Sequence, residues 1–177
     1  MTAVPRTRPS GRFLLSHPAH ALALGLGSGL SPWAAGTVGT LWAWAAFLVL
    51  QPWMNDARWG LLLLLALPLA WWACSVTARN LQAGDPGCIV IDEIVAFWLV
   101  LWLLMPAAWP EQLLAFVLFR YFDAAKPGPV GWADRLYHAM DPARTPHGWS
   151  KAGWGILFDD LVAAFCTLFV IAIWRTL

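Results

Sequence analysis

The chain alternates between long apolar runs and short clusters of polar residues. The run WGLLLLLALPLAWWACSVTA at residues 59–78, for example, contains no Asp, Glu or Lys and no Arg. A helix that crosses a membrane needs about 20 predominantly apolar residues, within a range of about 17–25. The pattern therefore predicts membrane-spanning helices over residues 36–54, 59–78, 92–109, 111–125 and 155–174.

Three segments depart from a simple apolar span. Residues 111–125 are short and amphipathic, so they fit a helix packed among the other helices. Residues 20–30 (HALALGLGSGL) carry glycine at alternate positions, which weakens a helix and predicts a re-entrant or tightly packed segment. A secretory signal sequence at the start of the chain is disfavoured, because Pro32 interrupts the apolar run and Trp33 fits a small-residue cleavage site poorly.

Composition supports a membrane protein. Apolar residues make up 60% of the chain and charged residues 12%, whereas an ordinary soluble domain has about 45–50% and about 25%. The chain has 14 Trp, a residue that favours the membrane–water boundary. The net charge of +1 offers no basic surface for nucleic acid. The bilayer is thus the predicted partner, and no feature predicts a protein partner.

Basic residues set the expected orientation. With a cytoplasmic N-terminus, all but two of the 11 basic residues face the cytoplasm, and the exceptions are Arg58 and Arg175. This distribution follows the positive-inside rule. The cysteines Cys74, Cys88 and Cys166 are odd in number and lack metal-ligand spacing, so they predict neither disulfides nor a zinc site.

Charged residues gather where the predicted helices meet the cytoplasmic face. One acidic pair starts the helix at 92–109, a second acidic pair lies in the first turns of the last helix, and a mixed triad ends the helix at 111–125. Carboxylate oxygens bind hard divalent cations, and Arg and Lys neutralise phosphate oxygens. The sequence therefore predicts a site for a divalent cation and a phosphate. The acidic members are Asp92, Glu93, Asp123, Asp159 and Asp160, and the basic members are Arg120 and Lys126.

Each of these groups also has a purely structural interpretation. Arg120, Asp123 and Lys126 are spaced three residues apart and could form an ion-pair ladder at a helix end. The acidic pairs could stabilise helix N-termini. The motif GTVGT at residues 36–40 could offer backbone N–H groups and the hydroxyls of Thr37 and Thr40 to an anion, or could serve capping and close helix packing. Residues 126–153 form one long polar connection, in which Asp134 is expected to have little effect.

Several blocks, in order along the chain, resemble the phosphatidylglycerophosphatase A family, small bacterial membrane enzymes that remove the terminal phosphate of phosphatidylglycerophosphate to give phosphatidylglycerol. The resemblance runs from about residue 20 to residue 164. It is carried by GLGSGLSP at 25–32 with GTVGT at 36–40, Asp85 with IVIDE at 89–93, FRYFDAAKPGPV at 119–130, and GWGILFDD at 153–160. It implies an all-α fold, dependence on Mg²⁺, a lipid substrate and a location in the bacterial inner membrane.

The resemblance also implies roles for individual residues. Asp92, Glu93, Asp123, Asp159 and Asp160 correspond to the acidic set, expected to hold metal, and Arg120 and Lys126 correspond to the cations on the phosphate side. We expect catalysis to depend on Asp123, Arg120 and Lys126, and phosphate binding on Arg120, Lys126, Thr37 and Thr40. His20 also falls on a family position. The chain departs from the family in having Ala164 where glycine is frequent and in a longer loop between Tyr137 and Gly153.

The expected protein is a single membrane-embedded domain over residues 1–177, with a polar N-terminal tail of about residues 1–16 and a polytopic bundle of about four to six helices. The main alternative function is a membrane carrier or channel that uses the carboxylates as an ion site. Charges restricted to one face disfavour that alternative, because transport sites usually lie near the bilayer midplane. A scaffold whose acidic residues only cap helices is the third possibility.

Overall fold

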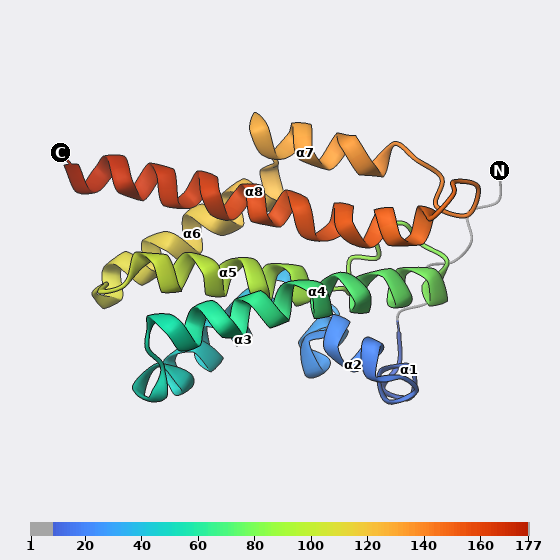
Figure 1. Cartoon of the computed structure of the whole chain (residues 1–177), viewed down its shortest axis with the longest axis horizontal. Coiled ribbons are helices and arrows are strands. Elements are labelled where there is room, and N and C mark those ends of the chain that lie inside the picture. The colour runs from blue at the N-terminus through green and yellow to red at the C-terminus, as the bar shows by residue number, and fades with distance from the viewer. Residues whose placement is uncertain (1–8, 177) are drawn as a thin grey trace.

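The computed structural model of the chain describes residues 9–176, apart from the side chain of His138. These residues form an all-α bundle without β-strands, which confirms the predicted all-α class, although this part of the chain has more α-helices than the predicted four to six (Figure 1). The α-helices are α1 (Gly11–Leu15), α2 (Pro18–Ala23), α3 (Ala35–Leu50), α4 (Asp56–Leu81), α5 (Ile91–Leu104), α6 (Trp109–Ala125), α7 (Pro129–His138) and α8 (Gly148–Thr176), and the 3₁₀ helices are η1 (Gly25–Leu30) and η2 (Gln51–Trp53).

The two longest helices, α4 and α8, lie side by side and run in opposite directions (Figure 1). They contain 26 and 29 residues, and both are long and apolar enough to cross a membrane. Gly153 of α8 faces Ser75 of α4 so closely that a Cβ at position 153 would lie 2.7 Å from the Ser75 backbone nitrogen. These two helices therefore pack backbone to backbone and support a membrane-associated protein.

The other predicted spans are helical; two of them are shorter than predicted, whereas α6 begins two residues before the predicted start at 111. The helix predicted at 36–54 ends at Leu50, and the helix predicted at 92–109 ends at Leu104, just before Met105 takes an extended conformation ahead of Pro106. A residue before proline is disfavoured in the α region, which explains the second end. The 14 residues of α5 span about 21 Å at 1.5 Å per residue, less than a hydrocarbon core of about 30 Å. Whether α3, α5 and α6 cross the bilayer thus stays a prediction.

The polar segment 126–153, which the sequence analysis describes as one long polar connection, contains helical structure. It contains α7, whose Trp132 and Tyr137 meet Phe158 of α8 edge to face. It also contains the first residues of α8, because this helix begins at Gly148 rather than near residue 155. The Pro- and Gly-rich composition of this segment gave no sign of α7, a short amphipathic helix that is stabilised by packing on α8.

The N-terminal tail and the glycine-rich stretch that follows it contain short helices. Residues 1–8 of the predicted tail lie outside the described residues, and Gly11–Leu15 form α1. The glycine-rich stretch 20–30 is divided between α2 and η1, and Leu26 and Gly27 have positive φ inside η1. The prediction of a tightly packed, irregular segment is therefore confirmed, since Gly25 and Gly29 are buried.

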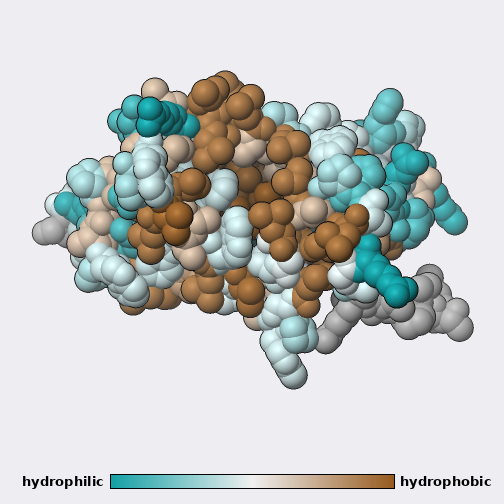
Figure 2. Space-filling model, turned by 90° about the horizontal axis from the view of Figure 1, so that it is seen from below, coloured by the Kyte–Doolittle hydropathy of each residue, from teal (hydrophilic) through white to brown (hydrophobic). Residues whose placement is uncertain are grey.

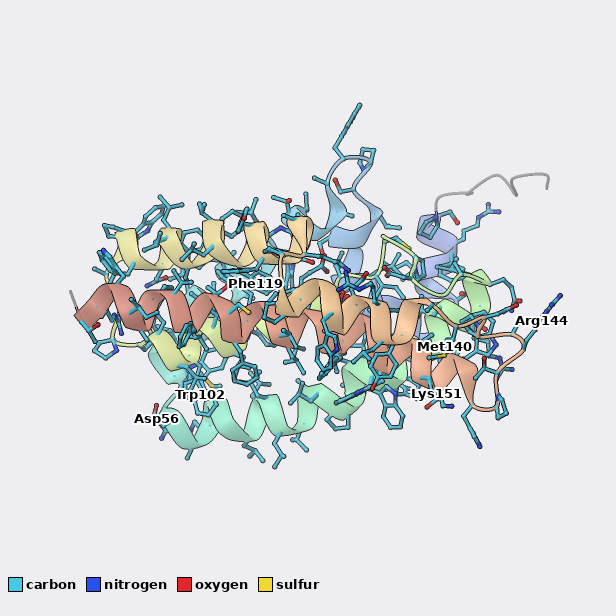
Figure 3. The ribbon with its side chains drawn as sticks, turned by 90° about the horizontal axis from the view of Figure 1, so that it is seen from above. Asp56, Trp102, Phe119, Met140, Arg144 and Lys151 are labelled. Carbon is cyan, nitrogen blue, oxygen red and sulfur yellow. The ribbon has the colours of Figure 1, made fainter. Side chains whose placement is uncertain are left out.

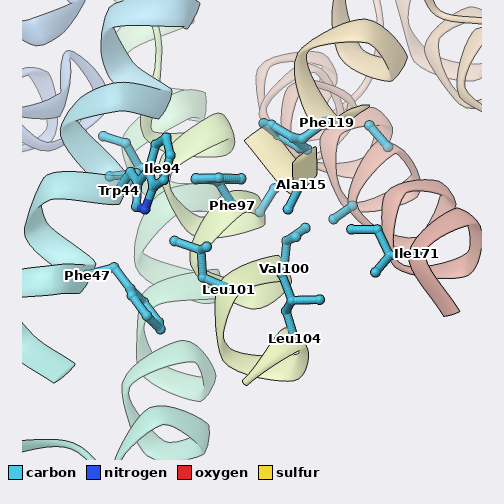
Figure 4. Close-up of a cluster of buried hydrophobic side chains, with 14 of the residues drawn as sticks. Trp44, Phe47, Ile94, Phe97, Val100, Leu101, Leu104, Ala115, Phe119 and Ile171 are labelled. Atoms are coloured by element: carbon cyan, nitrogen blue, oxygen red, sulfur yellow. The ribbon is translucent and has the colours of Figure 1, made fainter. Parts of the chain in front are cut away.

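The core is centred on α5, which contacts α3, α4, α6 and α8. Most of its side chains are buried, and Phe97 lies between Trp44 of α3 and Phe119 of α6 (Figure 4). Outside this core, the face seen in Figure 2 carries a continuous apolar band, with hydrophilic residues toward the two ends. Exposed leucines and tryptophans of α4 belong to the apolar surface, and the bilayer is the environment that suits it.

Candidate active site

Three helices bring the predicted acidic residues together. Asp92 and Glu93 lie in the first turn of α5, Asp123 lies in the last turn of α6, and Asp159 and Asp160 lie within α8. Asp92 and Glu93 are each 8% exposed, and Asp160 is 3% exposed. The sequence predicts Asp159 and Asp160 in the first turns of the last helix. Because α8 begins at Gly148, they lie in its interior instead. Their role therefore cannot be N-terminal capping of that helix.

Asp92, Glu93 and Asp160 form a group that could hold a metal ion. Each offers one carboxylate oxygen, and these oxygens lie within 4.8 Å of one another. Asp92 Oδ1, Glu93 Oε2 and Asp160 Oδ2 are buried and accept no hydrogen bond from the described residues. Burying carboxylate oxygens without partners is costly, and a donor set made only of carboxylates suits a hard divalent cation. The residues present therefore fit a metal ion.

Arg120 borders this group on the side of α3. Its guanidinium forms an ion pair with Asp123, lies 3.7 Å from Glu93 Oε1 and donates to Thr40 Oγ1 at 3.4 Å. The Thr40 hydroxyl in turn donates to the Gly36 carbonyl at 2.8 Å. A Cβ at position 36 would overlap Glu93 and lie 3.1 Å from Arg120 Nη2, so only glycine lets α3 approach the Glu93–Arg120 pair this closely.

Lys126 borders the group on the side of α7 and α8. Its ammonium donates to Asp159 Oδ2 at 2.5 Å and also to Asp134 of α7. Burial by itself lowers the pKa of Lys126, but the hydrogen bonds to Asp134 and Asp159 outweigh burial and raise the pKa above the ordinary lysine value. The predicted ladder is therefore formed only in part: Arg120 pairs with Asp123, whereas Lys126 pairs with α7 and α8.

The predicted threonines have different environments. Thr37 lies in the first turn of α3 and is half-buried, next to Gly36, whereas Thr40 is fully buried and its hydroxyl is engaged by Gly36 and Arg120. No side chain caps the N-terminus of α3, so its first backbone N–H groups donate to no capping side chain. Thr40 thus supports Arg120 from behind.

Sequence reasoning missed Asp134 and gave His20 no defined place. Asp134 was expected to have little effect, but it holds Lys126; this contact depends on the turn between α6 and α7, and no motif signals it. His20 is buried and its ring bonds to the Phe13 carbonyl, to Ser16 and to Asn80 at 2.8–3.0 Å. His20 thereby ties α1 and α2 to α4, which is a structural role.

Comparison with known proteins identifies relatives over nearly the whole chain. The profile of the family described as Phosphatidylglycerophosphatase A matches residues 21–175. Phosphatidylglycerophosphatase A of Escherichia coli (strain K12) is 35% identical over 165 residues, covering 92% of this chain and 88% of the relative. The enzyme of the same name from Haemophilus influenzae is 31% identical over 163 residues, covering 92% of each chain.

A relative from Bacteroides thetaiotaomicron is named for phosphatidylinositol-3-phosphatase activity; it is 32% identical over 160 residues, covering 85% of this chain and 89% of the relative. No solved structure matches the chain. All three relatives are therefore named as phosphatases of phosphorylated lipids.

The buried carboxylates predict how Asp160→Asn changes thermal stability. In EDTA, the variant is expected to unfold at a higher temperature than the wild type, because one of three crowded negative charges is removed. In Mg²⁺ at about 100 times its Kd, the wild type should gain about 2.7 kcal/mol, and the variant should gain much less. Thermal unfolding in detergent micelles measures both effects, with Asp56→Asn at the exposed start of α4 as the control. Equal stabilisation of wild type and Asp160→Asn by Mg²⁺ would contradict a metal site here.

Proposed function

Since the chain belongs to the phosphatidylglycerophosphatase A family, we propose that it hydrolyses the terminal phosphate monoester of phosphatidylglycerophosphate, giving phosphatidylglycerol and inorganic phosphate. As a member of this family the protein is a lipid phosphatase of phospholipid metabolism. The observation that supports the reaction best is the contact between Arg120 and the buried carboxylate group through Glu93. A cation for phosphate and a set of ligands for metal are thereby adjacent.

Charge balance favours a bound divalent cation, and we propose Mg²⁺. Five carboxylates and two cationic side chains converge at the site, so a phosphate dianion would meet a net negative charge in the absence of further cations. We assign Asp92, Glu93 and Asp160 as the main ligands, with Asp123 and Asp159 as the remaining carboxylates of the metal set. Bound Mg²⁺ would polarise the phosphate and lower the pKa of a coordinated water.

The two cationic side chains hold the phosphate in this mechanism. Arg120 presents a planar fork to two phosphate oxygens, and its Nη1 is held by Asp123 and Thr40. Lys126 supplies a point charge to a further oxygen. We assign Asp123 to accept the proton of the attacking water, because it adjoins the guanidinium that binds the phosphate. Phosphoryl transfer depends mainly on such positioning and charge neutralisation.

The start of α3 completes the proposed phosphate site. Gly36 lies against Glu93 and Arg120, which places the first turn of α3 beside the group. Backbone N–H groups at a helix N-terminus bind anions well. Thr37, in this same turn, is the residue of the GTVGT motif that we assign to substrate phosphate, whereas we reassign Thr40 to orienting Arg120.

For the membrane, we propose a multi-pass inner-membrane protein whose active site faces the cytoplasm. Figure 3 supports this arrangement, because Arg144 and Lys151 lie at one end of the molecule and Asp56 at the other. The basic residues would thus face the cytoplasm and the turn before α4 the opposite side. A site at the level of the lipid headgroups gives direct access to the phosphate of a lipid substrate.

The reaction predicts a specific pattern of phosphate release. Purified protein in mixed micelles should release inorganic phosphate from phosphatidylglycerophosphate in Mg²⁺ and not in EDTA. Asp123→Asn should abolish release while the thermal unfolding temperature stays near that of the wild type, because the shape of the side chain is kept. Faster release from phosphatidylinositol 3-phosphate would overturn the substrate assignment. Mg²⁺-dependent ion flux without phosphate release would favour the carrier alternative.

The phosphate-binding assignment predicts that Arg120→Lys impairs the enzyme more than Lys126→Arg. Loss of one hydrogen bond of the fork corresponds to roughly a 10–150-fold fall in turnover. Inorganic phosphate should also inhibit Arg120→Lys less strongly, because product and substrate share the bound oxygens. Kinetics at constant free Mg²⁺ measure both values. Full activity with unchanged phosphate inhibition would make Arg120 a structural ion-pair partner only.

The orientation predicts the labelling of single cysteines in intact cells. With Cys88 and Cys166 replaced by Ser, Ser150→Cys at the start of α8 should resist a membrane-impermeant maleimide until the cells are lysed. Asn55→Cys, at the turn before α4, should react before lysis. Reaction of Ser150→Cys in intact cells would show that the basic end of the molecule faces outward.

A further inference from the structure

Asp134 sits on a helix that is fixed against the site. α7 packs along α8, where Trp132 and Tyr137 contact Phe158, the residue just before Asp159. Gly155 of α8 lies so close to Tyr137 that a Cβ at position 155 would overlap the Cβ of the tyrosine. α7 is therefore held close to α8 by aromatic contacts on both sides of Asp134 in the sequence.

Lys126 is constrained at its backbone but carries a long side chain. It ends α6 in a left-handed conformation, with φ 47° and ψ 49°. Gly131, in the first turns of α7, approaches the Lys126 carbonyl so closely that a Cβ at this position would collide with it. A lysine ammonium nevertheless sits on a flexible four-carbon stem. The backbone alone therefore does not determine where the Lys126 ammonium lies.

Two carboxylates from different helices determine the position of the Lys126 ammonium. The ammonium has three N–H donors, of which one goes to Asp159 of α8 and one to Asp134 of α7. We propose that Asp134 is a positioning residue, which together with Asp159 holds the Lys126 ammonium so that its third N–H serves a phosphate oxygen of the substrate. This inference rests on the proposed role of Lys126 in binding phosphate.

A contribution to protein stability explains the Lys126–Asp134 contact less well than a positioning role does. The Lys126 and Asp134 side chains are 29% and 28% exposed, and ion pairs exposed to solvent typically contribute about 1 kcal/mol or less. The Asp141–Arg144 pair, farther along the same polar segment, is much more exposed and offers a control ion pair away from Lys126. Loss of Asp134 should thus leave the fold intact while it frees Lys126 to move.

A chemical test does not depend on the enzymatic reaction. The chain contains two lysines, Lys126 and Lys151, and Lys151 is exposed at the start of α8. Acylation requires an amine that is free to react, and hydrogen bonds to two carboxylates hold the Lys126 ammonium in place. In Asp134→Asn, acylation of Lys126 at mildly alkaline pH should rise about tenfold relative to Lys151, because one of these charge-assisted hydrogen bonds is lost. Asp141→Asn should leave the ratio unchanged. Mass spectrometry of the peptides measures it, and an unchanged ratio in Asp134→Asn would overturn the proposal.

Kinetic measurements test the consequence for substrate. Asp134→Asn should raise the KM for the lipid and the inhibition constant of inorganic phosphate about tenfold, with unchanged thermal unfolding. Asp134→Glu should restore part of both values, and Asp141→Asn should match the wild type. The double variant Asp134→Asn/Lys126→Ala should be no worse than Lys126→Ala, because Asp134 acts through that lysine. Additive losses would overturn the proposal.

The two measurements separate the inference from the function on which it rests. If the wild type releases no phosphate from any lipid monoester, the proposed function fails, and the acylation ratio still reports whether Asp134 holds Lys126. If the wild type is active and Asp134→Asn has wild-type KM and phosphate inhibition, the positioning role alone is wrong.

Discussion

The constraint on which the structure depends is the burial of like charges. Two unit negative charges 4.8 Å apart repel each other by about 3 kcal/mol at an effective dielectric constant of about 20. Asp92, Glu93 and Asp160 have carboxylate oxygens within this distance, and each residue is nearly inaccessible to water. A fold keeps such a group charged only if positive charge accompanies it. Arg120, Lys126 and a bound cation are the available sources.

The two cationic side chains meet this constraint from opposite sides. Arg120 reaches the group from α6 and is backed by Thr40 of α3, where Gly36 permits the close approach. Lys126 lies six residues farther along the chain, where it ends α6 with a left-handed backbone, and it pairs with Asp159 and Asp134. Each cation is thus held by a different pair of helices. A phosphate placed between them would be contacted from both sides.

The surroundings of the group suit chemistry on a lipid. α4 and α8 are long apolar helices, and the surface carries an apolar band that a bilayer would cover. The carboxylates lie inside the bundle, between the start of α5, the end of α6 and the interior of α8, rather than on an open polar surface. A substrate with acyl chains and a terminal phosphate can remain in the bilayer while its phosphate enters such a site.

The sequence by itself determined the all-α class, the approximate positions of five apolar helices and the acidic and basic residues that we propose for the site, because helix periodicity, apolar run length and charge clusters are local properties. Only the tertiary structure decided that Asp159 and Asp160 lie inside α8, that residues 129–138 form α7, and that Asp134 holds Lys126. Arg120 and Thr40 meet across 80 positions of the chain, and Lys126 and Asp159 across 33. Such contacts depend on how helices pack and where turns direct them, and no local spacing records that.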